Sequence, residues 1–310
     1  MTTLLLLIPL LLPLVAPPLA RRVLERLAPA TALWALATVV LVLAGACVAA
    51  LGSLVLTGLL KLPAFAALGE LVHPLRTPSG SLILPASAIA TGLVLVGAWT
   101  LARSVLRQTR AFRTAHAEAD RRPAAGDLCV VDSPEPDAYA LPGRPHRIVV
   151  TTAMLRSLGP DEREALFAHE RAHNAGGHHY FLAAAELAAH CHPALRPARA
   201  VIRLAAERAA DEAAAAAVGD RRLLARAIAR AALAGRSARS SRPDLAPAAT
   251  TGPVPQRVAA LLAAPAPRPR ALCAIALLLA ACTALSAAAA TAGAVAFHHE
   301  VEVAQGEAPR

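Results

Sequence analysis

Four long apolar stretches dominate the pattern of hydrophobic and polar positions along the chain. They cover residues 4–20, 31–60, 82–102 and 271–297. Each is near the roughly 20 residues that a helix needs to cross the hydrocarbon core of a bilayer. Four prolines interrupt the first stretch, and its cations follow it rather than precede it, which favours an uncleaved anchor over a signal peptide. The pattern therefore predicts four membrane spans.

The charges that flank these stretches predict the orientation. Arginines gather at 21–26, after the third stretch at 103–122, and before the fourth at 268–270. Positive flanks stay on the cytoplasmic side. We therefore expect a multi-pass protein of the cell membrane in which residues 1–102 hold three spans and 103–270 form a cytoplasmic domain. The tail 298–310, which is acidic, and the N-terminus would lie outside the cell.

Within 103–270 the polar pattern predicts a mixed domain. A charged helix continues out of the third span to Arg122, and β-branched runs at 128–131 and 147–151 predict strands. Turn residues occupy 139–143, and helices follow from Thr152 and over 199–218. Residues 236–256 are rich in Ser, Pro and Thr and predict a linker before a short amphipathic piece, 257–262. The expected fold class is mainly α, with a zincin-like α+β metallopeptidase domain inserted between spans.

Composition narrows the functional classes. Hydrophobic residues make up 56% and charged residues 17%, whereas soluble domains average about 25% charged. The lipid bilayer is thus an expected partner. The net charge of +10 is almost wholly arginine, since Lys61 is the only lysine. This usage is typical of a high-GC genome, and we expect no direct nucleic-acid binding. No C-x-x-C pair occurs among the five cysteines, which fits a reducing compartment.

The sharpest chemical signal is an H-E-x-x-H motif, His169-Glu170-Arg171-Ala172-His173. The i, i+4 spacing puts both imidazoles on one face of a helix, where they can bind one Zn²⁺ per chain. Glu170 would then take a proton from the metal-bound water. A solvent-facing polar stripe on an Ala/Glu/Arg-rich helix is the alternative interpretation.

A second acidic pair could complete the site. Glu207 and Asp211 are also spaced i, i+4, on an Ala-rich helix. Catalytic zinc needs a third protein ligand, which Glu207 can supply. Asp211 can accept the free N–H of a ligand histidine. Taken alone, the pair would be read as an ordinary exposed helix, but the motif one helix earlier favours the ligand interpretation.

The order of these motifs resembles that of gluzincin membrane proteases. The segment 139–151 and the His169 helix look like the HtpX and CAAX-prenyl-protease group. Three spans, a cytoplasmic protease domain and a fourth span resemble the BlaR/MecR antirepressor metallopeptidases. The resemblance implies a zinc endopeptidase with ligands His169, His173 and Glu207 and base Glu170. It also implies cleavage of a winged-helix repressor. The alternatives are HtpX-like quality control and a catalytically silent membrane scaffold.

Two departures from those relatives matter. After His173 their basic run is replaced by residues 174–179, Asn-Ala-Gly-Gly-His-His, so the helix exit is expected to differ. About a dozen residues follow the fourth stretch, where the antibiotic sensors carry a penicillin-binding domain. Gly58 stands three residues before Lys61, so no S-x-x-K site exists and covalent β-lactam binding is not expected.

The remaining histidines are weaker candidates for metal binding. We expect His178 and His179 to lie in a polar turn. His190 and His192 flank Cys191, but i, i+2 residues on a helix point in different directions and share a metal poorly.

The charge pattern makes the topology testable. Reporter fusions at Ala125 and at Leu262 should report the cytoplasm, and one after Val303 should report the exterior. A cytoplasmic signal after Val303 would contradict the four-span arrangement and remove one span.

Overall fold

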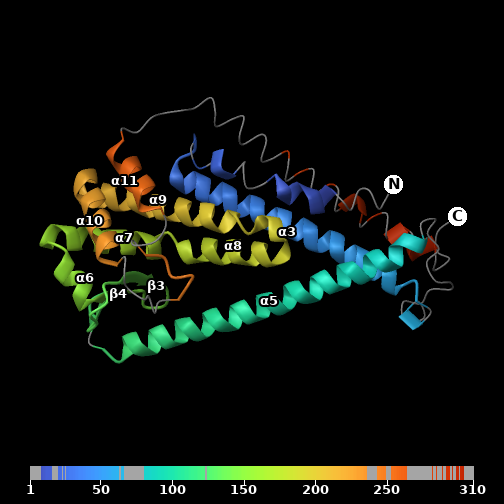
Figure 1. Cartoon of the computed structure of the whole chain (residues 1–310), viewed down its shortest axis with the longest axis horizontal. Helices are drawn as coiled ribbons and strands as arrows, with labels where there is room; N and C mark the ends of the chain where they lie inside the picture. Colours follow the sequence, from blue (N-terminus) through green and yellow to red (C-terminus); the bar gives the residue numbers. More distant parts are fainter. Residues whose placement is uncertain are drawn as a thin grey trace.

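The computed structural model is mostly helical, with one small sheet at one end of an elongated molecule (Figure 1). It describes residues 8–15, 26–62, 80–122, 124–235, 243–248 and 253–263. Scattered further residues are described at 20–24, 64–65 and 281–303. Of the predicted stretches, 4–20 and 236–256 lie partly, and 271–297 lies largely, outside the described residues.

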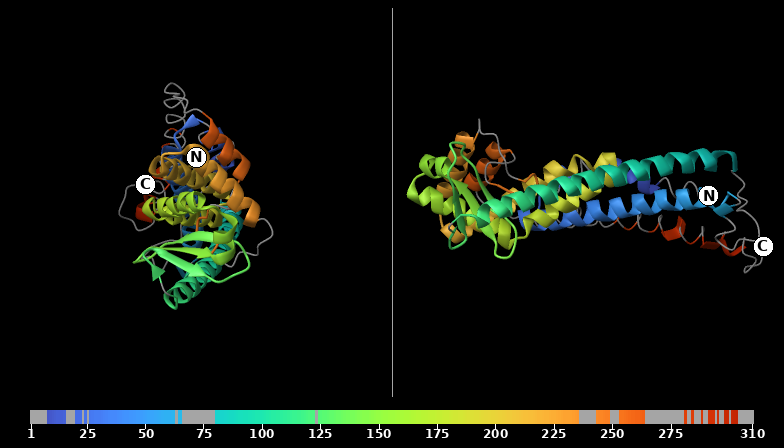
Figure 2. Two further views of the ribbon diagram at one scale, coloured as in Figure 1. Left: turned by 90° about the vertical axis from the view of Figure 1, so that its left-hand side faces the viewer. Right: turned by 90° about the horizontal axis from the view of Figure 1, so that it is seen from below.

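Among the residues that the structure describes, two helices are long and apolar enough to cross a membrane. Helix α3 (Pro29–Leu59) has 31 residues and α5 (Gly80–Asp120) has 41, which correspond to about 46 and 62 Å at 1.5 Å per residue. They lie side by side and extend away from the sheet (Figure 2). Both apolar stretches predicted here are therefore helices. The expected charged continuation of the third stretch is confirmed, because α5 runs unbroken past its arginines.

The first apolar stretch takes a different form in the residues described. It contains a short 3₁₀ turn, η1 (Leu12–Leu14), and Pro13 stands inside it. Proline lacks a backbone N–H and cannot continue a helical ladder. No long helix is found in the described part of this stretch.

The sheet has four short strands in the order β1-β2-β4-β3. β2 pairs parallel with β4, while β1 and β3 are antiparallel edge strands. Their bounds are β1 (Ala124–Ala125), β2 (Leu128–Val131), β3 (Ala138–Leu141) and β4 (Arg147–Thr151). The strands predicted at 128–131 and 147–151 are confirmed.

The turn predicted at 139–143 is wrong in its first half. Residues through Leu141 form β3, because Ala138, Ala140 and Leu141 are fully buried and pair with β4. Pro142 and Gly143 alone keep the turn chemistry. Residues 243–248 run beside this edge strand, where the Ala140 N–H donates to the Pro247 carbonyl at 3.3 Å.

Local signals set the ends of the helices that follow. The Glu162 carboxylate accepts from the Gly159 N–H at 3.0 Å at the start of α7, and Gly219 closes α9 with a left-handed φ of 77°. The Asp220 carboxylate then caps the next helix by accepting two backbone N–H groups. The elements are α6 (Thr152–Ser157), α7 (Pro160–Ala175), α8 (His178–Cys191), η2 (Pro193–Leu195), α9 (Ala198–Val218), α10 (Arg221–Ala234) and α11 (Val254–Leu262).

The apolar helix α3 shares one core with α8 and α9. Its first half packs on both helices, while its second half packs on α5. The facing positions of α8 and α9 are mostly alanine, which lets the helix axes come close. They include Ala185, Ala188, Ala198, Ala205 and Ala206, all buried. The helix expected to carry Glu207 is thus braced by a helix long enough to span a bilayer.

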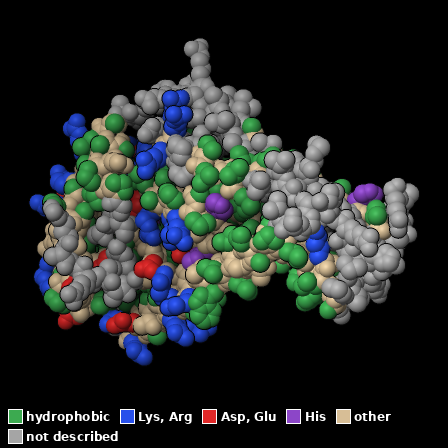
Figure 3. Space-filling model, turned by 45° about the vertical axis from the view of Figure 1, so that its right-hand side comes forward, with side chains coloured by type: hydrophobic (Ala, Val, Ile, Leu, Met, Phe, Trp, Pro, Cys, Tyr) green, Lys and Arg blue, Asp and Glu red, His purple; other side chains and the backbone are tan. Residues whose placement is uncertain are grey.

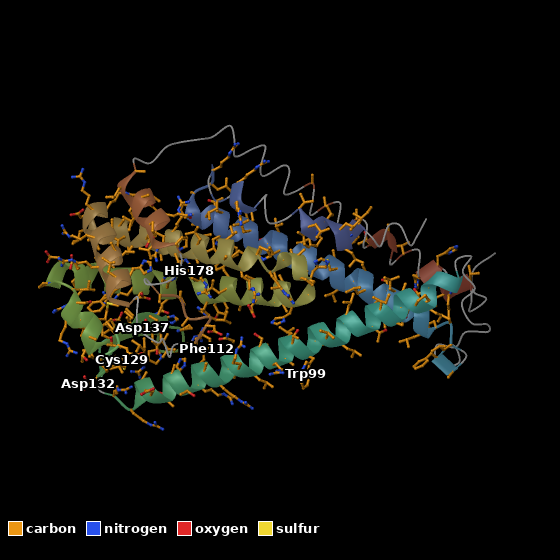
Figure 4. The ribbon with its side chains drawn as sticks, in the orientation of Figure 1. Trp99, Phe112, Cys129, Asp132, Asp137 and His178 are labelled. Carbon is orange, nitrogen blue, oxygen red and sulfur yellow. The ribbon has the colours of Figure 1, made fainter. Side chains whose placement is uncertain are left out.

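A polar cluster joins α5 to α8 where the apolar part of α5 ends. The Glu186 carboxylate accepts from the Ser104 hydroxyl at 3.2 Å and from Arg199 at 2.8 Å. His190 lies between Glu186, at 3.2 Å, and the Thr100 hydroxyl, at 3.0 Å. Trp99, one residue earlier on α5, is 65% exposed (Figure 4). The middle of α5 is therefore joined to α8 by polar contacts.

Candidate metal centre

Helix α7 carries the two histidines of the H-E-x-x-H motif on its buried face. His169 and His173 are one turn apart and both are 0% exposed. Their Nε2 atoms lie 3.0 Å from one another. The polar-stripe interpretation is therefore wrong, because this face is packed against α9 and not against solvent.

Helix α9 supplies a carboxylate to the same point. Glu207 is fully buried, and its Oε2 lies 3.5 Å from Nε2 of His169 and 3.6 Å from Nε2 of His173. Three ligands at 2.0–2.1 Å in tetrahedral directions lie roughly 3.4 Å from one another. The three atoms thus form a possible metal site with the spacing and donor types that zinc takes.

Asp211 stands one turn after Glu207 on α9 and reaches the other side of His169. Its Oδ1 lies 3.0 Å from the Nδ1 of His169, so that Nε2 of this ring is the nitrogen that faces Glu207. A carboxylate in this place fixes the tautomer and orientation of a ligand histidine. The structure therefore brings together His169, His173, Glu207 and Asp211.

Glu170 follows His169 on α7 and is also 0% exposed. Its negative charge is one of those that raise the pKa of the Arg257 guanidinium, so it belongs to the same buried group of charges.

The sequence analysis missed Arg257, which lies in the middle of this group. Its side chain is 0% exposed and comes from α11. Nε and Nη2 donate to the two oxygens of Asp211 at 2.8 and 2.7 Å, and Nη1 lies 3.0 Å from Oε2 of Glu207. A planar guanidinium can serve two carboxylates in this way. The sequence signal for this residue was its place at the start of the short amphipathic piece predicted at 257–262.

Packing and one further arginine hold α11 in place. Val258 and Leu261 pack with Ala165 of α7 and Ala214 of α9. The Arg221 Nε donates to the Leu261 carbonyl at 2.9 Å, which ties α10 to the end of α11. Arg257 is thereby delivered to the site from a third helix.

The charges of the site shift one another's pKa. Burial alone would lower the pKa of His169, but Asp211 and Glu207 outweigh it and raise that pKa to about 9. Burial tends to raise the pKa of Glu207, yet Arg257 and His173 hold it well below its usual range. Three buried carboxylates face one buried guanidinium, so the site favours a further positive charge. A divalent cation would supply it by displacing the proton of His169.

The polar turn expected at His178 and His179 is wrong, because both residues belong to α8 and the turn lies at Gly176 and Gly177. His178 is the first residue of α8 and is only 5% exposed, with its Nδ1 2.8 Å from the Nδ1 of His173. Burial lowers its pKa to about 3, so the ring is neutral. His179 instead stacks on Tyr180 at 3.9 Å between ring centroids. His190 serves the Glu186 cluster, and His192 accepts from the Ala194 N–H at 3.2 Å.

Comparison with known proteins supports a peptidase. Residues 107–192, which include α7 and α8, match the family described as Peptidase family M48. Members of this family are metal-dependent, typically on zinc. The matched segment ends before Glu207, Asp211 and Arg257. The structure places these three side chains next to the histidines of the matched segment. Neither curated proteins nor solved structures give a match to the chain.

The donor set makes metal binding testable. The purified full-length protein should hold about one Zn²⁺, and His169→Ala or Glu207→Ala should remove most of it because each loses a ligand. Asp211→Ala should weaken affinity by about 10- to 100-fold. Metal analysis after dialysis checks this, with the half-exposed Glu212→Ala as control. Normal zinc content in Glu207→Ala would reject the third ligand.

Removing Arg257 should destabilise the metal-free protein. Arg257→Met leaves two buried carboxylates without their cation, and breaking a buried pair costs about 3–5 kcal/mol. Arg257→Lys should not restore stability, since one ammonium cannot replace the planar fork. Denaturant unfolding measures both, with Arg226→Met as a control for an exposed arginine. An unchanged midpoint in Arg257→Met would show that the guanidinium does not hold these helices together.

Proposed function

We propose that this chain is an integral membrane zinc-dependent endopeptidase. The observation that carries the proposal is the buried His169, His173 and Glu207 triad, with ligand atoms 3.0–3.6 Å apart. The adjoining Glu170 and the match of residues 107–192 to a peptidase family support the same chemistry. A triad kept only for structure would not need a buried carboxylate directly after its first histidine.

In this mechanism His169, His173 and Glu207 would hold the zinc, and Asp211 keeps His169 in the tautomer whose Nε2 is free to bind it. When bound, the metal would polarise a peptide carbonyl and lower the pKa of water. The Glu170 carboxylate would accept a proton from the attacking water and return it to the leaving amine. Arg257 keeps Asp211 and Glu207 ionised, so that both remain acceptors at neutral pH.

The membrane part of the proposal is supported by the surface of α5. Only 17% of its most apolar 18-residue segment is buried inside the protein, which is a low share for the core helix of a soluble domain. Ile89, Leu95 and Trp99 are each more than 60% exposed. Basic side chains gather over the end of the molecule with the sheet (Figure 3). We therefore assign this end, with the site, to the cytoplasm, and both termini to the exterior of a multi-pass cell-membrane protein.

The proposed role is regulatory cleavage of a cytoplasmic or membrane protein, such as a winged-helix repressor. It rests on the resemblance of the predicted spans and inserted domain to the antirepressor metallopeptidases. Quality control of membrane proteins is the second candidate. The family match favours it, because residues 107–192 contain the segment that resembles the HtpX group. The test offers full-length protein in vesicles two substrates, a repressor encoded by an adjacent gene and an unfolded membrane protein. Cleavage of the repressor supports the regulatory role, and cleavage of the unfolded protein supports quality control.

Glu170→Gln should separate metal binding from catalysis. The amide cannot accept the proton of water, so cleavage should fall by at least about 10²- to 10⁴-fold while zinc content stays at the wild-type level. Glu164→Gln, at an exposed position of the same helix, is the matched control. Undiminished cleavage in Glu170→Gln would reject this mechanism. Zinc-loaded wild type without any detectable proteolysis would favour the silent scaffold.

A further inference from the structure

The turn between α7 and α8 places a third buried histidine behind the metal centre. Gly177 has a left-handed φ of 59°, a conformation that favours glycine. The helix is therefore interrupted at Gly176 and Gly177, and His178, the first residue of α8, lies beside His173. Figure 4 shows His178 beside the helices that carry the site.

The contact between His178 and His173 has only one consistent arrangement of protons when a metal is bound. Their Nδ1 atoms are 2.8 Å apart, so one must donate and the other accept. The Nε2 of His173 faces His169 and Glu207 and must be unprotonated to bind a metal. Its Nδ1 therefore carries the proton and donates it to the Nδ1 of His178.

The His178 ring is held in place from two sides. It stands edge-on to His173, with centroids 4.8 Å apart, and packs near Phe181, which belongs to the core shared with α3. A Cβ at Gly176 would lie 2.5 Å from the Nε2 of His178, so a side chain there would displace the ring. A glycine at position 176 is thus required for the ring to fit.

We propose that His178 is a positioning residue that fixes the tautomer and orientation of His173 for metal binding. It does for His173 what Asp211 does for His169. An imidazole nitrogen accepts the hydrogen bond without adding a further negative charge to three buried carboxylates. The inference rests on the proposed metal site and concerns a residue outside its ligands.

The test is the zinc affinity of the full-length protein in detergent, measured by chelator competition. His178→Phe keeps a ring but lacks an acceptor, and affinity should fall by about 10- to 100-fold, as for other partners of ligand histidines. His178→Asn should restore most of the affinity, because its Oδ1 takes the place of Nδ1. His179→Phe, one residue later and stacked on Tyr180, should bind zinc as the wild type does.

A second variant tests the same contact without changing the histidine. Gly176→Ala should displace the His178 ring and weaken zinc binding, whereas Gly159→Ala should not, since its nearest neighbour would lie at 3.6 Å. The visible spectrum of the Co²⁺-loaded His178→Phe protein should also change, because the His173 ligand turns. A loss of packing alone would leave His178→Asn as weak as His178→Phe.

The outcomes distinguish this inference from the proposed function. A folded His178→Phe protein with wild-type zinc affinity overturns the positioning role while His169→Ala still loses zinc. Wild-type zinc binding in His169→Ala would instead overturn the metal site itself. If His178→Phe does not fold, His178→Asn and Gly176→Ala decide: restored affinity in the first and weakened affinity in the second support the role, and any other result overturns it.

Discussion

A group of charges buried between α7 and α9 is the constraint on which the rest of this structure depends. Glu170, Glu207 and Asp211 are all nearly or fully inaccessible, and the buried guanidinium of Arg257 faces them. Buried carboxylates are tolerated only when cations and hydrogen-bond donors compensate the lost hydration. The packing of α7, α9 and α11 against one another brings the Arg257 guanidinium to these carboxylates. A divalent cation would offset the remaining negative charge.

Helix α9, which carries Glu207, packs together with α8 against a third helix. The alanine faces of α8 and α9 are covered by the first half of α3, a helix long and apolar enough to span a bilayer. The Glu186 cluster then fixes α5 to α8. Movement of α3 or α5 would therefore shift α8 and α9, which carry His178 and Glu207. The geometry of the site therefore depends on helices outside the segment 103–270.

Local sequence signals predicted many of the elements but not their partners. Gly159-Pro160 and the acids after it begin α7, Gly219 ends α9, and two β-branched runs form strands, because each signal acts within a few residues. The β3 strand was missed because its alanines have little strand propensity of their own. Ala138 and Ala140 become a strand by pairing with β4 and by burial, which no local pattern contains.

The sequence by itself determined the chemistry of the ligands: the spacing of His169, His173, Glu207 and Asp211 on two helices already predicted which groups share a face. Only the tertiary structure decided which further residues reach that face. Arg257 lies 46 residues after Asp211 and on a different helix, in a chain where arginine is common. Spacing along the sequence therefore could not show which arginine reaches the site. His178 is close in sequence, yet its burial depends on the break between α7 and α8, on the space left by Gly176, and on the core against which α8 packs. Periodicity fixes directions within one helix, whereas a contact between helices depends on packing that the whole chain must supply.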